Sequence, residues 1–533
     1  MANPTVTIER GIASVEFSAF DLNEYDTFLR AKKLPESKLV YDRDRDVYVL
    51  TTAARFAPQL DERIVIPPVE IPDLADWLFD YQEFVTHRAL DRKRYAVWAD
   101  CGLGKTPMGL EFGRCANLMT GGKVLFAAPP SVIPQWLGDA EKFYGGGMPI
   151  KRIDSREALI EWLQDPSDLD FAICSFYLFA GEPISEMRLL AAFILDESSI
   201  LKSGGGKIKW GLIKSARGIE YKLSLTATPA PNDTMEFASQ FGFLEMLRSE
   251  NTNEILWTFF ERKGDDGEWQ LRPHAREAFF RFMASGSIFV RDPSRFGFKD
   301  NLKNVPAPVY LASHVAITED QIKRAEAVIK APLNAMDPPK LDATQRMKLS
   351  EIAKGFLLVG GKPIGVHSLK PAAVAKVVAE EVAAGLKVIV WTTFNEEAAM
   401  LASLIPGAER IDGSATESER ERILDRLEHG DTNVVISKAS VLGFGRNLQF
   451  VGAMVCSGFN DSNEQFYQMV RRAYRYGQTR SLRVHIPYIP ELEGQMWDNL
   501  LSKAARSESD ASEQEHWYLT ALREEGLNLA VAA

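Results

Sequence analysis

Short apolar runs alternate with amphipathic stretches over most of the chain. The first series of apolar runs occupies residues 94–99, 123–128, 171–175, 192–196 and 222–227. A second series occupies residues 387–393, 409–412, 433–437, 453–457 and 482–487. Unbroken apolar strands separated by helical stretches are typical of parallel sheets that helices cover on both faces. The pattern therefore predicts an α/β fold with two parallel-sheet lobes.

The segments outside these two series have other patterns. Residues 1–70 alternate over short strand lengths and include a hairpin pattern, which predicts a small, β-rich α+β module. A stiff proline-rich linker at residues 65–72 ends this module. The predicted organisation then continues with a first lobe over 71–238, a helical insertion and linker over 239–345, a second lobe over 346–505 and a C-terminal helical tail over 506–533.

Composition narrows the class of protein without identifying it. A chain of 533 residues is too long for one core, and its 46% hydrophobic and 25% charged residues are ordinary for globular domains. The four cysteines are scattered, which favours the cytoplasm and argues against disulfides or a structural zinc site. No apolar run approaches the roughly 20 residues that span a bilayer. Because the net charge is −11, any surface that binds nucleic acid must be local.

The strongest candidate site is the segment Ala99-Asp-Cys-Gly-Leu-Gly-Lys-Thr106, between a predicted strand and a predicted helix. Backbone N–H groups around Gly102 and Gly104, together with the helix N-terminus, can surround a phosphate group. Lys105 can reach the terminal phosphates, and the Thr106 hydroxyl can ligate Mg²⁺. Alanine stands where the strict pattern G-x-x-x-x-G-K-[ST] has its first glycine. Taken alone, the segment could also be an ordinary glycine-rich turn.

Two further motifs follow in the first series. Ile194-Leu-Asp-Glu-Ser-Ser199 ends a predicted strand, so we expect Asp196 to hold Mg²⁺ and Glu197 to orient the attacking water. Residues 223–232 place small hydroxyl side chains at the end of the next strand, where they can hydrogen-bond the Asp-Glu pair. A surface carboxylate pair and a proline turn are the alternatives. Their position after the phosphate loop favours the functional interpretation.

A basic segment lies in the second lobe, Gln468-Met-Val-Arg-Arg-Ala-Tyr-Arg-Tyr-Gly-Gln478. On a helix, Arg472 and Arg475 are three residues apart and share a face. Arginines directed at a site in another lobe suit the stabilisation of charge on a transferring phosphate. A solvated basic helix is the alternative.

The order of these motifs resembles that of the superfamily 2 helicase motors, and specifically their Swi/Snf branch. Residues 100–106 are similar to the D-E-x-G-L-G-K-T loop of that branch, which also lacks the first glycine. Residues 196–199 resemble the D-E-A-H box, and residues 225–232 resemble L-T-G-T-P-x-x-N. Residues 437–448 and 468–478 resemble the second-lobe motifs in the correct order. The resemblance covers about residues 74–488.

This resemblance implies two RecA-like lobes that bind ATP and Mg²⁺ and grip double-stranded or branched DNA. It implies that Gln82 reads the adenine and that Gly445 of the second lobe contacts the nucleotide. It also implies one catalytic set, Lys105, Asp196, Glu197, Arg472 and Arg475. Ser198 and Ser199 depart from the Ala-His of the family, which puts the usual histidine coupling in doubt.

Two stretches are candidates for DNA contact. Residues 271–303 contain seven Lys/Arg and three Asp/Glu, interleaved with phenylalanines. Their helical spacing assigns the phenylalanines mostly to the core and leaves the basic residues as candidates for phosphate contact. The module at residues 1–70 resembles the HARP-type module of annealing helicases around Tyr41 and Val47-Tyr-Val49.

We therefore expect a DNA-dependent ATPase that acts as a monomeric motor, alone or with partner proteins, and makes no contact with membranes. It would translocate on duplex DNA and remodel branched structures or displace bound protein. A strand-separating helicase and the motor subunit of a restriction-type complex are alternatives within the enzymes. A nucleotide-gated DNA-binding scaffold is an alternative of another class. The compact size favours the cytoplasm of a bacterial or phage-infected cell.

Overall fold

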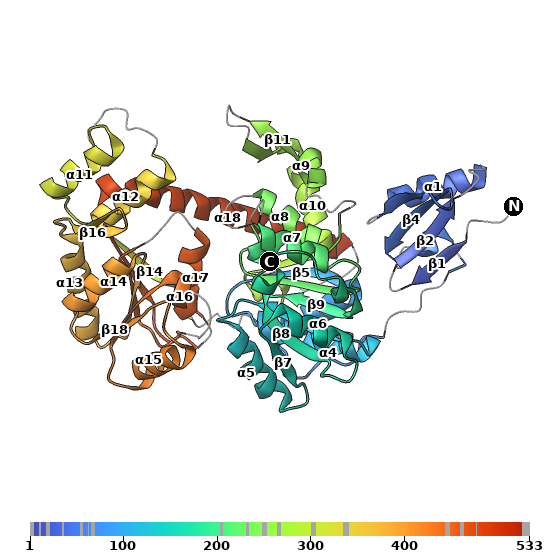
Figure 1. Cartoon of the computed structure of the whole chain (residues 1–533), viewed down its shortest axis with the longest axis horizontal. Helices are drawn as coiled ribbons and strands as arrows, with labels where there is room; N and C mark the ends of the chain where they lie inside the picture. The colour runs from blue at the N-terminus through green and yellow to red at the C-terminus, as the bar shows by residue number, and fades with distance from the viewer. Residues whose placement is uncertain are drawn as a thin grey trace. The chain divides into compact units, whose positions relative to one another are not determined.

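The chain forms two compact units in the computed structural model (Figure 1), one comprising residues 1–299 and 510–533 and the other residues 300–509. The structure describes residues 5–9, 12–17, 22–34, 37–53, 57–61, 63–64, 70–202, 206–230, 234–247, 253–263, 268–299, 305–333, 341–442, 448–458, 463–475 and 477–524. Among these residues, no helix has both the length and the apolarity required to cross a bilayer.

The N-terminal module is a small antiparallel sheet with helices packed on one side. Its strand order is β1-β2-β4-β3, formed by β1 (Val6–Glu9), β2 (Ile12–Phe17), β3 (Lys38–Asp42) and β4 (Val47–Ala53). The helices are α1 (Leu22–Lys33) and α2 (Ala57–Leu60). Alternate residues of β2, which are Ala13, Val15 and Phe17, are fully buried against these helices. The period-2 pattern of the sequence is the cause of this one-sided core.

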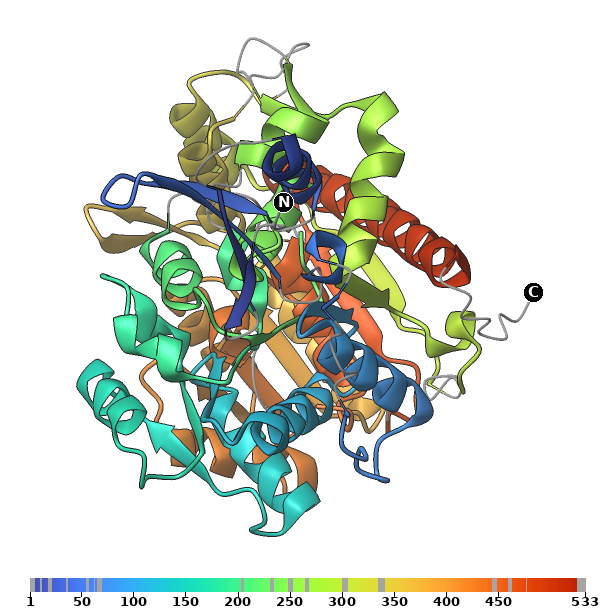
Figure 2. The ribbon, with the colours of Figure 1, turned by 90° about the vertical axis from the view of Figure 1, so that its right-hand side faces the viewer.

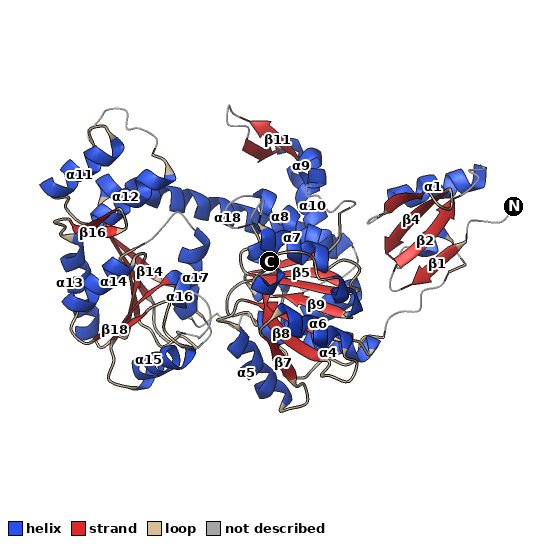
Figure 3. Ribbon diagram, in the orientation of Figure 1, coloured by secondary structure: helices blue, strands red, loops and turns tan. Residues whose placement is uncertain are grey.

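The first lobe is built on a parallel sheet of order β13-β5-β10-β9-β6-β8-β7. Its strands are β5 (Arg94–Ala99), β6 (Val124–Ala128), β7 (Ile150–Ile153), β8 (Phe171–Ser175), β9 (Ala192–Leu195), β10 (Tyr221–Thr226) and β13 (Ser287–Val290). Its helices are α3 (Asp80–Arg92), α4 (Lys105–Thr120), α5 (Ile133–Tyr144), α6 (Arg156–Gln164), α7 (Lys207–Ser215), α8 (Phe237–Phe243), α9 (Asn253–Phe259) and α10 (Arg276–Gly286). Strands β5, β6, β9 and β10 are almost wholly buried because helices flank the sheet (Figure 3).

The second lobe repeats this plan with a parallel sheet of order β14-β21-β20-β17-β19-β18. Its strands are β14 (Val309–His314), β17 (Val388–Thr392), β18 (Ala408–Ile411), β19 (Val434–Lys438), β20 (Ala453–Cys456) and β21 (Arg483–Tyr488). Its helices are α11 (Glu319–Ile329), α12 (Ala343–Ala353), α13 (Lys370–Ala383), α14 (Asn395–Leu404), α15 (Glu417–His429), α16 (Ala439–Leu442) and α17 (Asn463–Ala473). A hairpin of β15 (Phe356–Val359) and β16 (Lys362–Gly365) follows α12. The two parallel sheets confirm the predicted α/β fold class.

The segment predicted as one helical insertion, residues 239–345, divides between the two units. Strand β13 pairs with β5 and completes the first sheet, whereas β14 pairs with β21 at the edge of the second. The segment also contains a hairpin of β11 (Phe260–Lys263) and β12 (Glu268–Leu271). The predicted boundaries therefore differ from the structure, because each sheet recruits an edge strand that is distant in sequence from its other strands.

The predicted C-terminal tail is the continuation of one long helix, α18 (Pro490–Glu524), drawn in red in Figures 1 and 2. Its first turns pack in the second unit, where Leu492 and Met496 are buried. Its residues from Asp510 onward belong to the first unit, where Gln514 and Tyr518 are fully buried. The polar sequence pattern predicted a helix but not these buried positions.

Glu493 on the first part of α18 lies in a buried cluster of charges. Its carboxylate accepts two 2.7 Å hydrogen bonds from Lys370 Nζ and a 3.1 Å bond from Lys354 Nζ. All three side chains are almost wholly buried. Burial lowers the pKa of Lys370 to about 8, whereas the two lysines hold the pKa of Glu493 below its usual range against the effect of burial. The carboxylate is therefore the group that makes two buried ammonium groups tolerable.

We expect Glu493→Gln to destabilise the second lobe by roughly 3–5 kcal/mol, because the variant removes the negative charge that both buried ammonium groups contact. Urea unfolding, monitored by hydrogen exchange of the amides in β17 and β20, measures this change in the free energy of unfolding. The matched control is Glu380→Gln, since the Glu380 side chain is 63% exposed and lies 4.0 Å from Lys376. The control should change stability by less than about 0.5 kcal/mol. Equal stability of the two variants would contradict the role of the cluster.

Candidate nucleotide-binding site

The predicted phosphate loop lies between β5 and α4, at the carboxyl edge of the first sheet. Gly102 and Gly104 have φ angles of 86° and 75°, in the left-handed region that favours glycine. Helix α4 begins at Lys105, so its first N–H groups lack partners within the helix and face the loop. This arrangement of glycine turn and helix N-terminus can bind an anion.

The Lys105 side chain folds back over its own loop. Its Nζ donates a 3.0 Å hydrogen bond to the carbonyl oxygen of Ala99 and lies 3.5 Å from that of Asp100. These carbonyl oxygens hold the ammonium group at the centre of the loop. Thr106, the next residue, is buried at the start of α4.

Helix α3 fixes the loop from the other side. Gln82 Nε2 and the Tyr81 hydroxyl both donate to the carbonyl oxygen of Leu103, over 3.1 and 2.8 Å. Burial raises the pKa of Tyr81, so this hydroxyl stays protonated and remains a donor. A Cβ atom on Gly104 would approach Gln82 Nε2 to 2.1 Å. Gln82 therefore lies at the phosphate loop, and its adenine-reading role stays a prediction.

Asp196 and Glu197 follow the end of β9, at the same edge of the sheet. Strand β10 lies between β9 and β5 with parallel pairing on both sides, so the ends of the three strands are aligned. Asp196 is 5% exposed. Its Oδ1 accepts a 2.9 Å bond from the backbone N–H of Glu197, and its Oδ2 accepts a 2.7 Å bond from Trp136 Nε1. Glu197 has φ 47°, a strained value for a residue with a side chain.

No sequence motif selects Trp136, because its segment has the pattern of an amphipathic helix with an apolar face. A general rule is the one signal that could have indicated a polar contact of Trp136: the N–H group of a buried tryptophan usually finds a hydrogen-bond acceptor.

The hydroxyl groups after β9 and on β10 form a buried network. The Ser224 hydroxyl lies 2.9 Å from that of Ser198 and also donates to Gln240 Oε1 on α8. Gln240 Nε2 donates a 2.9 Å bond to the carbonyl oxygen of Ser198. The predicted hydroxyl contact thus comes from Ser224 and reaches the residue after the Asp-Glu pair. Ser198, which departs from the family pattern, is the residue that joins β10 and α8 to this turn.

The arginines of the second lobe lie around the end of α17. Arg472 is the penultimate residue of this helix, which ends at Ala473. The prediction that Arg472 and Arg475 share a helical face is therefore wrong, because Arg475 lies in the turn beyond the helix. The backbone N–H of Gln478 donates a 3.0 Å hydrogen bond to the carbonyl oxygen of Arg475, and Gly477, just before Gln478, has φ 93°. The predicted nucleotide contact Gly445 lies outside the described residues.

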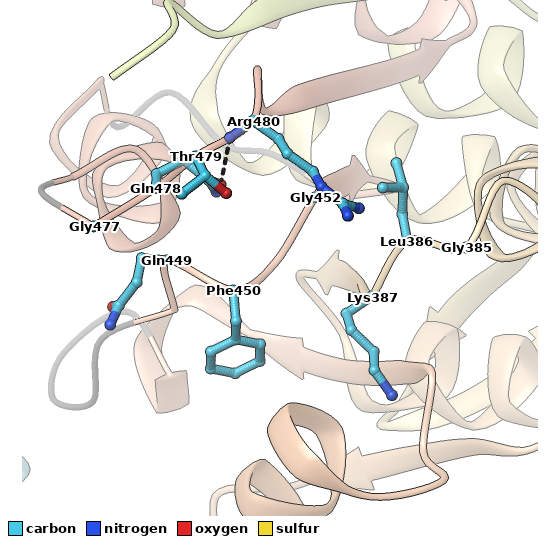
Figure 4. A pocket seen from close by; sticks show the side chains of 10 residues that line it. All are labelled: Gly385, Leu386, Lys387, Gln449, Phe450, Gly452, Gly477, Gln478, Thr479 and Arg480. Atoms are coloured by element: carbon cyan, nitrogen blue, oxygen red, sulfur yellow. Dashed lines mark hydrogen bonds between the residues drawn. The ribbon is translucent and has the colours of Figure 1, made fainter. Parts of the chain in front are cut away.

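A cavity of about 380 Å³ lies in the second lobe near this turn (Figure 4). Its lining residues are Gly385, Leu386, Lys387, Gln449, Phe450, Gly452, Gly477, Gln478, Thr479 and Arg480. Lys387, Gly452 and Arg480 precede β17, β20 and β21, so the cavity is at the amino ends of these strands. Nucleotides bind at the carboxyl ends of parallel strands. The cavity is therefore at the opposite end of the strands from the expected nucleotide contacts of the second lobe.

Three arginines of the basic stretch at residues 271–303 form ion pairs within the first unit. Phe279 and Phe280 are fully buried, which confirms their assignment to the core. Arg276 pairs with Asp510 and Glu513 of α18, and Arg295 pairs with Glu515. Arg281 pairs with Glu277 and lies 4.8 Å from the ring centre of Trp517. These pairings reduce the charge that the stretch could offer to a DNA phosphate.

A comparison with known families matches part of the second lobe. Residues 369–477 match the family model described as the helicase conserved C-terminal domain. This match confirms the predicted resemblance to superfamily 2 helicases over the lobe that carries α17. The chain is also similar to protein p41 of Acyrthosiphon pisum secondary endosymbiont phage 1, with 25% identity over 427 residues, which are 74% of this chain and 87% of p41.

Two solved structures from Sulfolobus solfataricus have similar chains. One is the SWI2/SNF2 ATPase core in complex with dsDNA, at 18% identity and a TM-score of 0.37, covering 88% of this chain and all of that chain. The other is the SWI2/SNF2 ATPase core domain, at 17% identity and a TM-score of 0.37, covering 82% of this chain and 91% of that chain.

We expect Gly104→Ala to disorder the phosphate loop. The new methyl group would collide with Gln82 Nε2, and a left-handed conformation costs a residue with a side chain roughly 1–3 kcal/mol. Hydrogen exchange of the amides at residues 100–106 should accelerate. Gly138→Ala on α5 is the control, because its added Cβ meets nothing within 4 Å. Unchanged exchange in Gly104→Ala would contradict both the contact with Gln82 and the need for glycine at this left-handed position.

Proposed function

We propose that this protein, whose residues 369–477 match the helicase conserved C-terminal domain, is an ATP-dependent DNA translocase of the Swi/Snf type. One observation carries the proposal: a phosphate loop and a strand-end Asp-Glu pair lie at one edge of the first sheet, in a chain whose second lobe is of helicase type. We infer that the motor moves along duplex DNA and remodels branched structures or displaces bound protein.

The residues present fit ATP with Mg²⁺. Mg²⁺ commonly takes one or two carboxylates together with substrate phosphates and water, rather than a cage made by the protein alone. Asp196 offers one carboxylate and Thr106 one hydroxyl, and among the described residues there is no cluster of three or more His, Cys, Asp or Glu that could hold a metal. Bound there, Mg²⁺ would neutralise charge on the phosphate oxygens.

Each side chain of the site would then have one task. Lys105 would exchange its two carbonyl partners for the terminal phosphates, while the N–H groups at the start of α4 hold the phosphate oxygens. Glu197, next to Asp196, would orient the attacking water and accept its proton. Arg472 and Arg475 would stabilise the negative charge that develops during transfer. The alternative of a nucleotide-gated scaffold does not require this hydrolytic set.

We expect Lys105→Ala and Glu197→Gln to lower ATP turnover at least about 100-fold, because each removes a group that acts on the transferring phosphate or its attacking water. Steady-state phosphate release measures the loss, and circular dichroism verifies folding. Lys142→Ala on α5 is the control, since Lys142 is exposed and its ammonium group lies over the ring of Phe143. Retained turnover in both variants would overturn the site assignment.

We expect duplex or forked DNA to stimulate ATP hydrolysis more strongly than single-stranded DNA or RNA of the same length. Translocation on a duplex requires contacts with its phosphates, so the stimulation should fall as salt rises. Phosphate release with matched oligonucleotides at several salt concentrations makes the comparison. Equal stimulation by single strands would favour a strand-separating helicase, and nucleotide binding without stimulated turnover would favour the scaffold.

A further inference from the structure

Trp136 makes a buried contact with the carboxylate that follows β9. It lies in the first turn of α5 and is fully buried. Its indole Nε1 donates a 2.7 Å hydrogen bond to Oδ2 of Asp196. A bond of this length to a carboxylate is charge-assisted and stronger than a bond between neutral groups.

The Asp196 carboxylate is held at both oxygens. Trp136 occupies Oδ2, and the backbone N–H of Glu197 occupies Oδ1 over 2.9 Å. The backbone N–H of Asp196 donates in turn to the carbonyl oxygen of Ala127 on β6, over 2.8 Å. A carboxylate oxygen has two lone-pair positions, so one hydrogen bond to an oxygen does not by itself prevent that oxygen from binding a metal. The two hydrogen bonds fix the rotation of the Asp196 carboxylate.

The same indole ring also packs against the helix that starts at the phosphate loop. A Cβ atom on Gly109 of α4 would come within 2.6 Å of Trp136 Cη2, so the ring and the helix backbone are in close contact. The centre of the Trp136 ring also lies 5.1 Å from that of the Phe126 ring on β6. Trp136 therefore touches the helix that carries Thr106 and binds the carboxylate of Asp196.

We propose that Trp136 is a positioning residue for the magnesium–nucleotide complex. Trp136 holds the Asp196 carboxylate at a fixed rotation and sets the distance between α4 and the end of β9. It thereby fixes the relative positions of the two expected magnesium ligands, the Asp196 carboxylate and the Thr106 hydroxyl. This inference rests on the proposed ATP site and adds a residue to it. Partners of this kind, which bind a metal ligand rather than the metal, typically contribute about 10–100-fold to metal affinity.

The lobe contains a matched control for this contact. Trp162 on α6 is also almost wholly buried, and its Nε1 also donates a 2.7 Å hydrogen bond, but to the backbone carbonyl oxygen of Leu169. Trp136→Phe and Trp162→Phe therefore delete the same group from equally buried sites. They differ in whether the lost acceptor is the Asp196 carboxylate.

The test measures metal binding without turnover. Mn²⁺ replaces Mg²⁺ in the presence of a non-hydrolysable ATP analogue, and the free Mn²⁺ signal in electron paramagnetic resonance gives the dissociation constant. We expect Trp136→Phe to weaken Mn²⁺ binding about 10-fold or more. Binding of the analogue in EDTA should be unchanged, and Trp162→Phe should match the wild type in both measurements.

Two outcomes would overturn the positioning role alone. These are wild-type Mn²⁺ affinity in Trp136→Phe and an equal loss in Trp162→Phe, which would indicate packing only. If the wild-type protein itself binds no Mn²⁺ with the analogue, the proposed ATP site fails, and the positioning role fails with it.

A second variant and a metal-free measurement guard against misfolding of Trp136→Phe. Replacing the indole of Trp136 by benzothiophene keeps the shape of the ring and removes only the N–H donor, and it should reproduce the loss of Mn²⁺ affinity. In the nucleotide-free protein, Asp196→Asn should shift the indole ¹H–¹⁵N resonance of Trp136 and leave that of Trp162 in place. An unmoved Trp136 resonance would overturn the contact itself.

Discussion

The candidate site depends on the parallel pairing of β5, β10 and β9. In the observed register Thr226 lies beside Trp98 and Ser224 beside Leu195, so the three strands end at one edge. The phosphate loop follows the first of these strands, and Asp196 follows the last. Both faces of the sheet are buried, so the site inherits its geometry from a rigid core.

Around this edge, side chains with no expected catalytic role hold the catalytic side chains and the phosphate loop in position. Gln82 and Tyr81 hold the loop through the Leu103 carbonyl oxygen, and Trp136 holds the Asp196 carboxylate. Ser224 and Gln240 hold the turn after Glu197. Each of these contacts joins the sheet edge to a different helix. Displacement of α3, α5 or α8 would therefore alter the site without touching its catalytic groups.

Many charged residues of this protein form ion pairs that hold helix α18 in place. The helix α18 places Glu493 between two buried lysines in one unit and pairs acidic residues with Arg276 and Arg295 in the other. Buried ion pairs contribute little net stability against well-packed apolar residues, but removal of one partner is costly. Part of the basic stretch at residues 271–303, a candidate for DNA contact in the sequence, thus forms ion pairs with α18.

The sequence by itself determined the α/β class, five strands of each lobe, the phosphate loop and the strand-end Asp-Glu pair. These features follow from apolar periodicity and from local motifs, which act over a few neighbouring residues. Only the tertiary structure decided that β13 and β14 complete the two sheets, that Arg475 lies beyond α17, and that Trp136 reaches Asp196. These features depend on which distant segments meet. An apolar or charged residue has the same local pattern whether its partner is solvent, a helix or a catalytic carboxylate.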